Sequence, residues 1–186
     1  MIRKATAIGL GLMMTVIGQS AVLGHMVYER VALLRTGQEI SLAMAPRDPR
    51  SLFRGYYARL SYTISTINLK DVEGADTFKR KSAIYVILAP DDTGAWTPVS
   101  VHTSPMPVAA GQAMVRGTVK YMNGSQASVR VDYGIESYFL PKAEAQRIER
   151  LPIADMRVRA AVGTDGTIAI KGILVDGKLE YAEPPF

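Results

Sequence analysis

Two carboxylic acids lie close together in the stretch "RVDYGIESYF", residues 130–139. As a pair, Asp132 and Glu136 are residue types that can perform general acid–base work when one holds a proton that the other lacks. The residues just before them alternate between apolar and polar, which is typical of a strand with one face in solvent, and Gly134 is a natural turn residue. The pattern allows two interpretations: a polar groove for a peptide, glycan or partner loop, or the exposed end of an ordinary strand.

A second stretch, "RSLFRGYYARLSY", combines arginine with tyrosine and ends at Tyr62. If residues 56–67 form one regular strand, Leu60 and Tyr62 share the face that enters the core, whereas Tyr57 points away from it. We expect this stretch and residues 130–139 to form one interaction surface, made of Arg54, Tyr57, Arg59, Asp132, Tyr133, Gly134, Glu136 and Tyr138. Nucleic acid is not the expected partner, because the net charge of +5 is modest and no Lys/Arg footprint accompanies the aromatic residues.

The residues that could bind a metal do not form a set. The sequence contains no cysteine, and outside the N-terminal segment it has one histidine, His102, which alone is not a zinc site. The run "DDTG", residues 91–94, resembles a hairpin turn more than a calcium loop. We therefore expect no metal and no cofactor.

A nucleophile with its base is also missing from the pattern. A membrane-anchored Ser/Lys peptidase would need a serine at Ala43, before Met44-Ala45-Pro46, and no lysine lies between Lys4 and Lys70 to activate Ser51. The expectation is therefore a protein that is not an enzyme, with no catalytic residues. The alternative is an envelope hydrolase or peptidase-like enzyme built from carboxylates and Ser51.

Residues 5–28 run for 24 positions without Asp, Glu, Lys or Arg. As a helix this segment would be about 36 Å long, enough to cross a bilayer core of about 30 Å with some tilt. We predict a transmembrane helix over 5–28 after an N-terminal tail, residues 1–4, on the cytoplasmic side, with the body outside. The rival interpretation is a cleaved signal peptide with a small-residue site at 18–20, which would begin the mature chain near Ala21.

Small residues recur along one face of this predicted helix. At about 100° per residue they fall on a stripe that ends in a polar side chain. Small residues let two helices approach closely in lipid, so the stripe indicates packing against a polytopic membrane protein, unless it reflects only the usual abundance of glycine and alanine in spanning helices. The stripe consists of Ala7, Gly11, Thr15, Gly18, Ala21 and His25.

The rest of the chain has the pattern of a β protein. A polar connector, 29–50, holds a short candidate strand at 39–43, and residues 51–186 form a β-rich domain. Short apolar or alternating runs are separated by Asn-Gly and Asp-Gly turns, and one helix is expected at 141–151, where Pro141 suits a first helical turn. The fold class that follows is mainly β: an antiparallel sandwich or a barrel-like domain with one short helix, preceded by the single N-terminal helix.

Four stretches carry a more specific likeness: "DPRSLFRGYYARLSY", "AIYVILAPDDTGAW", "VRVDYGIESYFLP" and "VGTDGTIAIKGILVDG". In this order the sequence resembles the GDYXXLXY family over most of residues 36–177, with Gly55, Tyr57, Leu60 and Tyr62 as the motif residues. The resemblance implies a membrane-anchored bacterial protein and no established activity. One departure is that Tyr56 stands where the family has aspartate, so a role for that carboxylate is absent or supplied elsewhere.

Together these features predict a single-pass protein of the bacterial inner membrane with a periplasmic C-terminal domain. The expected function is that of a non-catalytic accessory or interaction domain in a cell-envelope membrane assembly, with the lipid bilayer and a polytopic membrane protein as partners. Besides the enzyme, the remaining alternative is a module that binds a small ligand or the cell wall.

Overall fold

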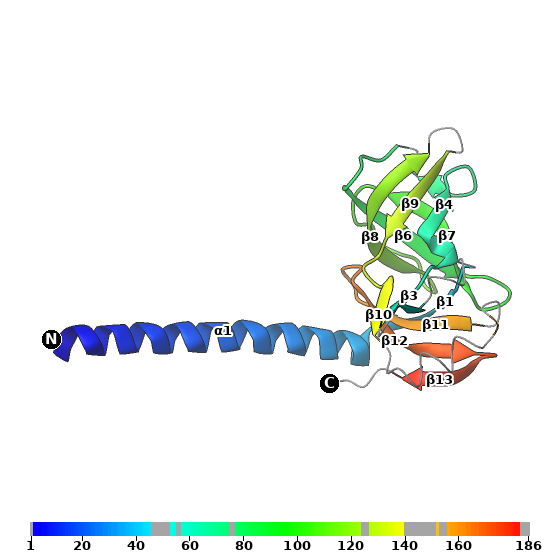
Figure 1. The fold of residues 1–186 in the computed structure, drawn as a ribbon. Coiled ribbons are helices and arrows are strands. Elements are labelled where there is room, and N and C mark those ends of the chain that lie inside the picture. The colour runs from blue at the N-terminus through cyan, green and yellow to red at the C-terminus, as the bar shows by residue number, and fades with distance from the viewer. Residues whose placement is uncertain are drawn as a thin grey trace.

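The computed structural model describes residues 2–45, 53–54, 57–74, 77–123, 127–139, 152 and 156–182; within these ranges the side chains of residues 2–10, 53–54, 57–59, 139 and 180 are not described. One long helix, α1 (Ile2–Thr36), projects from a body made of strands (Figure 1). The backbone N–H of Gly37 donates to the carbonyl oxygen of Leu33 at 2.9 Å and closes the helix. The first strand of the body, β1 (Gln38–Ala43), starts at the next residue.

α1 is longer than the predicted helix at both ends, because it begins at Ile2 and continues past Tyr28 to Thr36. Residues 2–4 of the predicted tail and residues 29–36 of the predicted connector are therefore helical, while the strand expected at 39–43 is confirmed as β1. Measured over the residues that the structure describes, no helix combines the length and the hydropathy that a membrane crossing requires. The predicted span over 5–28 is confirmed as a helix only.

A four-stranded antiparallel sheet lies next to the end of α1. Its last two strands are joined at Asp176 and Gly177, which both have a positive φ, 48° and 74°, as the tight hairpin turn predicted there requires. In spatial order the strands are β1, β11 (Met156–Val162), β12 (Ile168–Val175) and β13 (Lys178–Ala182).

A six-stranded sheet forms the other large part of the body (Figure 1). All its pairings are antiparallel except that of β5 with β7. The predicted turn at 91–94 joins β6 to β7, and Asp91 Oδ1 holds it by accepting hydrogen bonds from the backbone N–H of Thr93 at 2.8 Å and of Ala95 at 3.0 Å. In spatial order the strands are β4 (Thr66–Asn68), β9 (Ser128–Asp132), β8 (Ala113–Asn123), β6 (Ala83–Pro90), β7 (Trp96–His102) and β5 (Glu73–Gly74).

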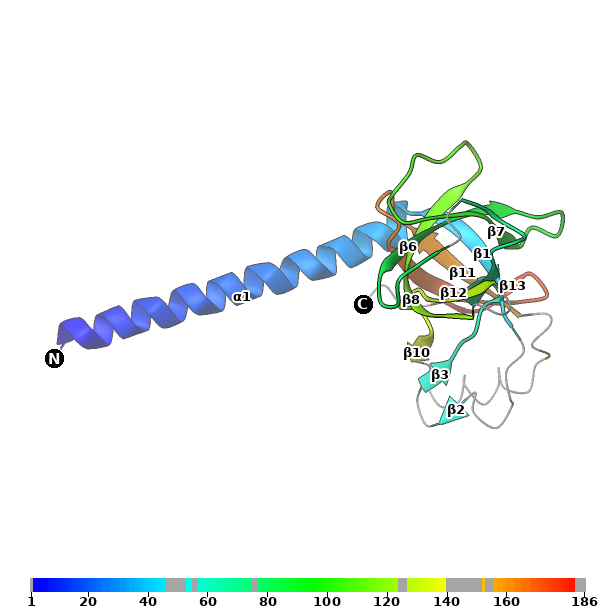
Figure 2. The same ribbon diagram turned by 90° about the horizontal axis from the view of Figure 1, so that it is seen from above.

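The two large sheets curl around one hydrophobic core, which includes residues from both of them (Figure 2). Alternation along the strands supplies it: in β9, Val129 and Val131 are buried while Arg130 and Asp132 are half-buried. The expectation of a mainly β body behind an N-terminal helix is therefore confirmed. The helix expected at 141–151 lies outside the described residues.

The predicted single strand over 56–67 is wrong. The first part of this stretch belongs to a small third sheet. In spatial order the strands of that sheet are β10 (Ser137–Phe139), β3 (Tyr57–Arg59) and β2 (Phe53–Arg54). The chain then makes a 3₁₀ turn, η2 (Thr63–Ser65), before it joins the six-stranded sheet as β4. The Ser65 hydroxyl accepts from the backbone N–H of Tyr62 at 3.4 Å, and such local side-chain bonds compete with a strand ladder.

Gly172 provides a test of the four-stranded sheet. A methyl group at this position of β12 would meet the backbone carbonyl oxygen of Tyr181, on β13, well inside van der Waals distance. Gly172→Ala should therefore push β13 away and lower the free energy of unfolding by about 1–3 kcal/mol. Chemical denaturation of both proteins measures the loss, and Ala182→Ser, at an exposed position of β13, serves as the control. Unchanged stability of Gly172→Ala would contradict the close approach of the two strands.

Candidate functional site

The two stretches that sequence analysis assigned to one interaction surface are neighbours in the structure. β3 and β10 pair in antiparallel register, with Ala58 opposite Tyr138. Just beyond the pair, the backbone N–H of Leu60 donates to the carbonyl oxygen of Glu136 at 2.8 Å. The ladder thus fixes residues 57–60 against residues 136–139, whereas the interaction surface itself stays a prediction.

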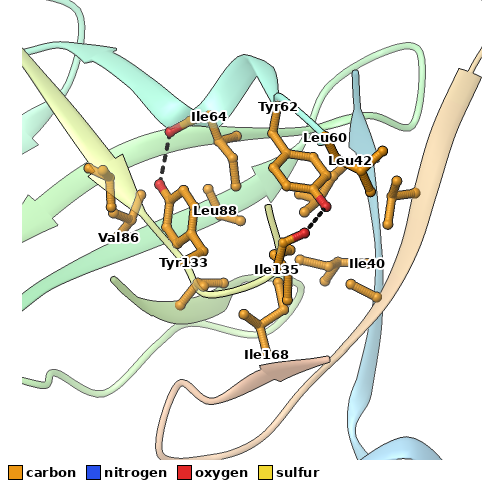
Figure 3. Close-up of a cluster of buried hydrophobic side chains, with 14 of the residues drawn as sticks. Ile40, Leu42, Leu60, Tyr62, Ile64, Val86, Leu88, Tyr133, Ile135 and Ile168 are labelled. Atoms are coloured by element: carbon orange, nitrogen blue, oxygen red, sulfur yellow. Dashed lines mark hydrogen bonds between the residues drawn. The ribbon is translucent and has the colours of Figure 1, made fainter. Parts of the chain in front are cut away.

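Two tyrosine side chains cross-link these stretches through their hydroxyl groups (Figure 3). The Tyr62 hydroxyl donates to the carbonyl oxygen of Ile135 at 2.7 Å, and the Tyr133 hydroxyl donates to the carbonyl oxygen of Ile64 at 2.8 Å. The bonds are reciprocal, because each stretch gives one hydroxyl group and one carbonyl group. We call this arrangement the tyrosine brace. Buried carbonyl groups in irregular backbone need such a partner, which explains why these positions hold tyrosine and not phenylalanine.

Burial defines what the brace can do chemically. Both rings are almost wholly buried, and burial raises the pKa of the Tyr62 and Tyr133 hydroxyl groups well above the ordinary value. The neighbouring Glu136 raises both further. Each hydroxyl group therefore stays protonated near neutral pH and remains a hydrogen-bond donor to the backbone.

Part of the predicted interaction surface is therefore internal. Leu60 and Tyr62 are buried as expected, but Tyr133 and Tyr138 are buried as well, and Tyr138 packs edge-on against Tyr181 with ring centroids 6.0 Å apart. The reason is the turn at Gly134, which has a φ of 79° and sends the chain back along the body, so that the residues on either side face inward.

Asp132 and Glu136 face each other across this turn and share a hydrogen bond. Burial, with the hydrogen bond to Asp132 as the next cause, raises the pKa of Glu136 to about 6. The hydrogen bond from Glu136 is the main reason why the pKa of Asp132 falls to about 2, with Lys120 and the backbone of Gly134 adding to it. Between these two pH values the shared proton resides on Glu136, which donates, and Asp132 is the acceptor.

The same two carboxyl groups also bind the backbone of the turn. Glu136 Oε1 accepts from the backbone N–H of Tyr133 at 2.6 Å, and Asp132 Oδ1 accepts from that of Gly134 at 3.1 Å. Asp132 Oδ2 lies 2.7 Å from Lys120 Nζ. Their oxygens are engaged within the protein, so the acid pair acts as a clamp on the turn that carries Tyr133.

An open hollow of about 590 Å³ adjoins this turn. Asp132, Tyr133 and Gly134 line one part of it, and β8 lines another. Sequence analysis missed the other residues that reach the hollow, because they come from three separate stretches; the run "KRK" at 79–81 was the available signal. The charged ones among them are Arg80, Lys81, Arg116 and Lys120.

Several of the predicted residues lie wholly or partly outside what the structure describes. Gly55 and Ser51 lie outside the described residues, as do the side chains of Arg54, Tyr57 and Arg59. The stripe on α1 is exposed from Gly11 to His25, and a methyl group at Gly11 or Gly18 would meet nothing within 4 Å. The Ala7 side chain is outside the described residues. The predicted packing of the stripe on a second helix stays a prediction.

A comparison with protein families finds a match. The family model described as "GDYXXLXY protein" matches residues 19–173, which covers both halves of the tyrosine brace and the acid pair. No curated protein and no solved structure matches the chain.

The tyrosine brace predicts a cost for removing either hydroxyl. Tyr62→Phe and Tyr133→Phe should each lower the free energy of unfolding by about 1–3 kcal/mol, because each leaves a buried carbonyl group without its donor. Tyr121→Phe is the matched control, since Tyr121 is 58% exposed, and it should change stability by less than about 0.5 kcal/mol. Chemical denaturation gives all three values, and equal stability of the four proteins would refute the brace.

The acid pair predicts a dependence of stability on pH. The folded-state pKa of Glu136, about 6, lies above its ordinary value of 4.5, so its stabilising effect is complete below pH 4.5 and is lost as the pH rises through about 6. In Glu136→Gln the amide can donate to Asp132 and accept from Tyr133 at every pH. The variant should therefore gain in melting temperature over the wild type as the pH rises from 4.5 to above 6.

The control for this measurement is Glu39→Gln. The hydrogen bond from Lys171 lowers the pKa of Glu39, so its own contribution to stability lies above pH 4.5 and is lost in more acidic solution. Glu39→Gln should keep the wild-type slope between pH 4.5 and 6. If the curves of Glu136→Gln and the wild type ran parallel through this range, the shared proton would be disproved.

Proposed function

The chain belongs to the GDYXXLXY family, and since that name specifies no activity, we propose a function from the geometry of the protein itself. The protein is a non-catalytic interaction domain that α1 tethers to a lipid bilayer. The body presents the rigid β9–β10 turn and its surroundings to a partner in a membrane assembly. We place it in the bacterial inner membrane with the body on the periplasmic side.

The proposal that α1 is a membrane tether is supported by the apolar side chains that are exposed on all sides of this helix. Successive side chains of a helix point in different directions, and α1 has exposed apolar side chains in every direction. Those that are more than half exposed are Leu12, Met13, Met14, Val16, Ile17, Val22, Leu23, Met26 and Val27. A helix that is apolar on every side is stable only when it is surrounded by apolar groups. The body of the protein does not provide these groups, since it meets α1 only near its C-terminal end (Figure 1).

The sequence supports lipid as the surrounding medium. Within the described residues no helix combines the length and hydropathy of a membrane crossing, but residues 5–28 are 24 successive positions without Asp, Glu, Lys or Arg. The proposed anchor is the whole segment 5–28. Arg3 and Lys4, just before it, favour a cytoplasmic N-terminus.

The absence of catalysis is supported by the state of the acid pair and the brace. A general acid or base must reach the proton that it transfers, whereas Asp132 and Glu136 bind each other and the backbone of their own turn. The Tyr62 and Tyr133 hydroxyl groups are bound to carbonyl groups in the core. What this arrangement supplies is a rigid turn, and a preorganised turn reduces the entropy that binding a partner costs.

Alkaline extraction of membranes tests the tether. The full chain, expressed in a bacterium, is expected to stay in the pellet. Val16→Lys with Leu23→Lys should move it to the supernatant, because each lysine in the centre of a spanning helix costs about 2.5–3.5 kcal/mol. Gln38→Lys with Thr164→Lys adds the same charge outside the segment and should leave the chain in the pellet. Release of the wild type by alkali would refute the tether.

Site-specific crosslinking tests the interaction domain. A photo-reactive amino acid in place of the exposed Ser137, beside the β9–β10 turn, should yield one discrete crosslinked partner in native membranes. The same group in place of Asp176, in the β12–β13 hairpin, should not yield it. The assignment fails if Ser137 gives no product, and specific turnover of an envelope substrate by the pure protein would replace it by the hydrolase alternative.

A further inference from the structure

We propose that the hollow beside the β9–β10 turn binds a phosphate-bearing anion, supplied either by the headgroup of an acidic lipid or by free phosphate. The lipid source rests on the tether proposed above, whereas the free source does not. Three observations carry the inference: the charges that line the hollow, the backbone of the turn that supplies two of them, and the position of the hollow relative to α1.

The lining of the hollow is strongly cationic. Among the described residues that form it, four carry a positive charge and one, Asp132, a negative charge. Lys120 Nζ lies 2.7 Å from Asp132 Oδ2, and the Arg80 Nε–H donates to the backbone carbonyl oxygen of Lys120 at 3.2 Å, so the Arg80 side chain is held against β8. The remaining pair, Lys81 and Arg116, adds charge on the same rim. Like charges gathered around an open hollow create a field that attracts an anion.

Asp165 must be counted against this field, because its carboxylate lies near Arg116. It is engaged mainly with Thr167, through the hydroxyl group and the backbone N–H at 3.0 Å, and Asp165 does not line the hollow. It therefore offsets part of the charge of Arg116 and leaves the hollow cationic. Arginine suits a phosphate because its planar fork can donate two parallel hydrogen bonds, and lysine adds a compact charge.

The turn that carries Arg80 and Lys81 is held in an unfavourable conformation. Lys81 has a φ of 66°, in the left-handed region where glycine is normal and lysine is uncommon. Two bonds to β8 impose it: the Lys81 N–H donates to the Val119 carbonyl at 2.8 Å, and the Val119 N–H donates to the Ser82 carbonyl at 3.0 Å. Glycine would fit this backbone better, so a lysine here costs stability. Such strain is typical of binding positions.

The hollow lies on the side of the body from which α1 projects. Figures 1 and 2 both place β8 on that side. The backbone N–H of Arg116 donates to the carbonyl oxygen of Gly166 at 2.9 Å, and the turn around Gly166 lies next to the base of α1: Leu33, Gly163 and Thr167 line a common pocket there. Thr167 lines the cationic hollow as well. If α1 crosses a bilayer, the hollow faces the headgroups, where each basic residue contributes attraction to acidic lipids.

Hydrogen–deuterium exchange on the full chain tests the inference in two arms. In the first, the protein in neutral detergent receives sodium pyrophosphate or, at equal ionic strength, sodium chloride. In the second, it is placed in nanodiscs of phosphatidylcholine, with or without phosphatidylglycerol. We expect pyrophosphate, phosphatidylglycerol or both to slow exchange at residues 79–82 and 116–120. Effect in the first arm alone identifies free phosphate as the source, and effect in the second alone identifies the lipid.

Lys81→Gly is the central variant, because glycine accepts the positive φ and the variant should be at least as stable as the wild type. It should weaken the anion effect about fivefold, the expected contribution of one basic residue. Arg116→Gln should do the same. Lys70→Gln removes an equal charge from an exposed turn elsewhere and should leave the effect unchanged.

The outcomes separate this inference from the tether. No protection in either arm overturns the inference, because the hollow then binds no anion. An equal loss in Lys70→Gln and Lys81→Gly overturns it as well, since it would mean general electrostatics only. A chain that does not enter nanodiscs of either composition refutes the tether, and the pyrophosphate arm then decides the inference alone.

Discussion

The body depends on the reciprocal bonds between Tyr62 and Ile135 and between Tyr133 and Ile64. At this point the chain passes from the small sheet to the six-stranded sheet through η2, and the carbonyl groups of Ile64 and Ile135 accept hydrogen bonds from tyrosine side chains. A tyrosine side chain can supply a donor in the interior at the cost of burying only one polar atom. The two bonds thus allow an irregular crossing to be packed inside the core, where an unpartnered carbonyl group would cost about 1–3 kcal/mol.

The acid pair follows from the brace. For Tyr133 to reach Ile64, the chain after β9 must reverse within a few residues, and Gly134 with its positive φ allows the reversal. The reversal leaves backbone N–H groups at Tyr133 and Gly134 without strand partners, and the carboxyl groups of Glu136 and Asp132 accept from them. Two acids so close together cannot both ionise readily, and sharing a proton resolves the conflict. The two acids that suggested catalysis are therefore explained by the geometry of a turn.

The sequence predicted those parts of the fold that depend on local pattern. Alternation located β9, an apolar run located β6, and Asp176-Gly177 located the last hairpin, because burial and turn chemistry act over a few neighbouring residues. The break at Thr63–Ser65 was not predicted, since the partners that stabilise it are more than 60 residues away in the sequence, at Tyr133 and Ile135. The cationic hollow was missed for the same reason: its charges come from separate strands and turns that only the sheet register brings together.

The junction at Gly37 fixes the position of the hollow relative to α1. A polar connector was expected over residues 29–50, yet Gly37 alone separates the helix from β1, and β1 is paired along its length with β11. A side chain at Gly37 would meet the Leu33 carbonyl oxygen at 2.6 Å and Ala161 Cβ at 3.0 Å, so the helix end packs directly on the sheet. An axis fixed in this way fixes which face of the body turns toward whatever surrounds α1. The same close junction therefore links an apolar helix and a cationic face, the two features that a lipid surface would require together.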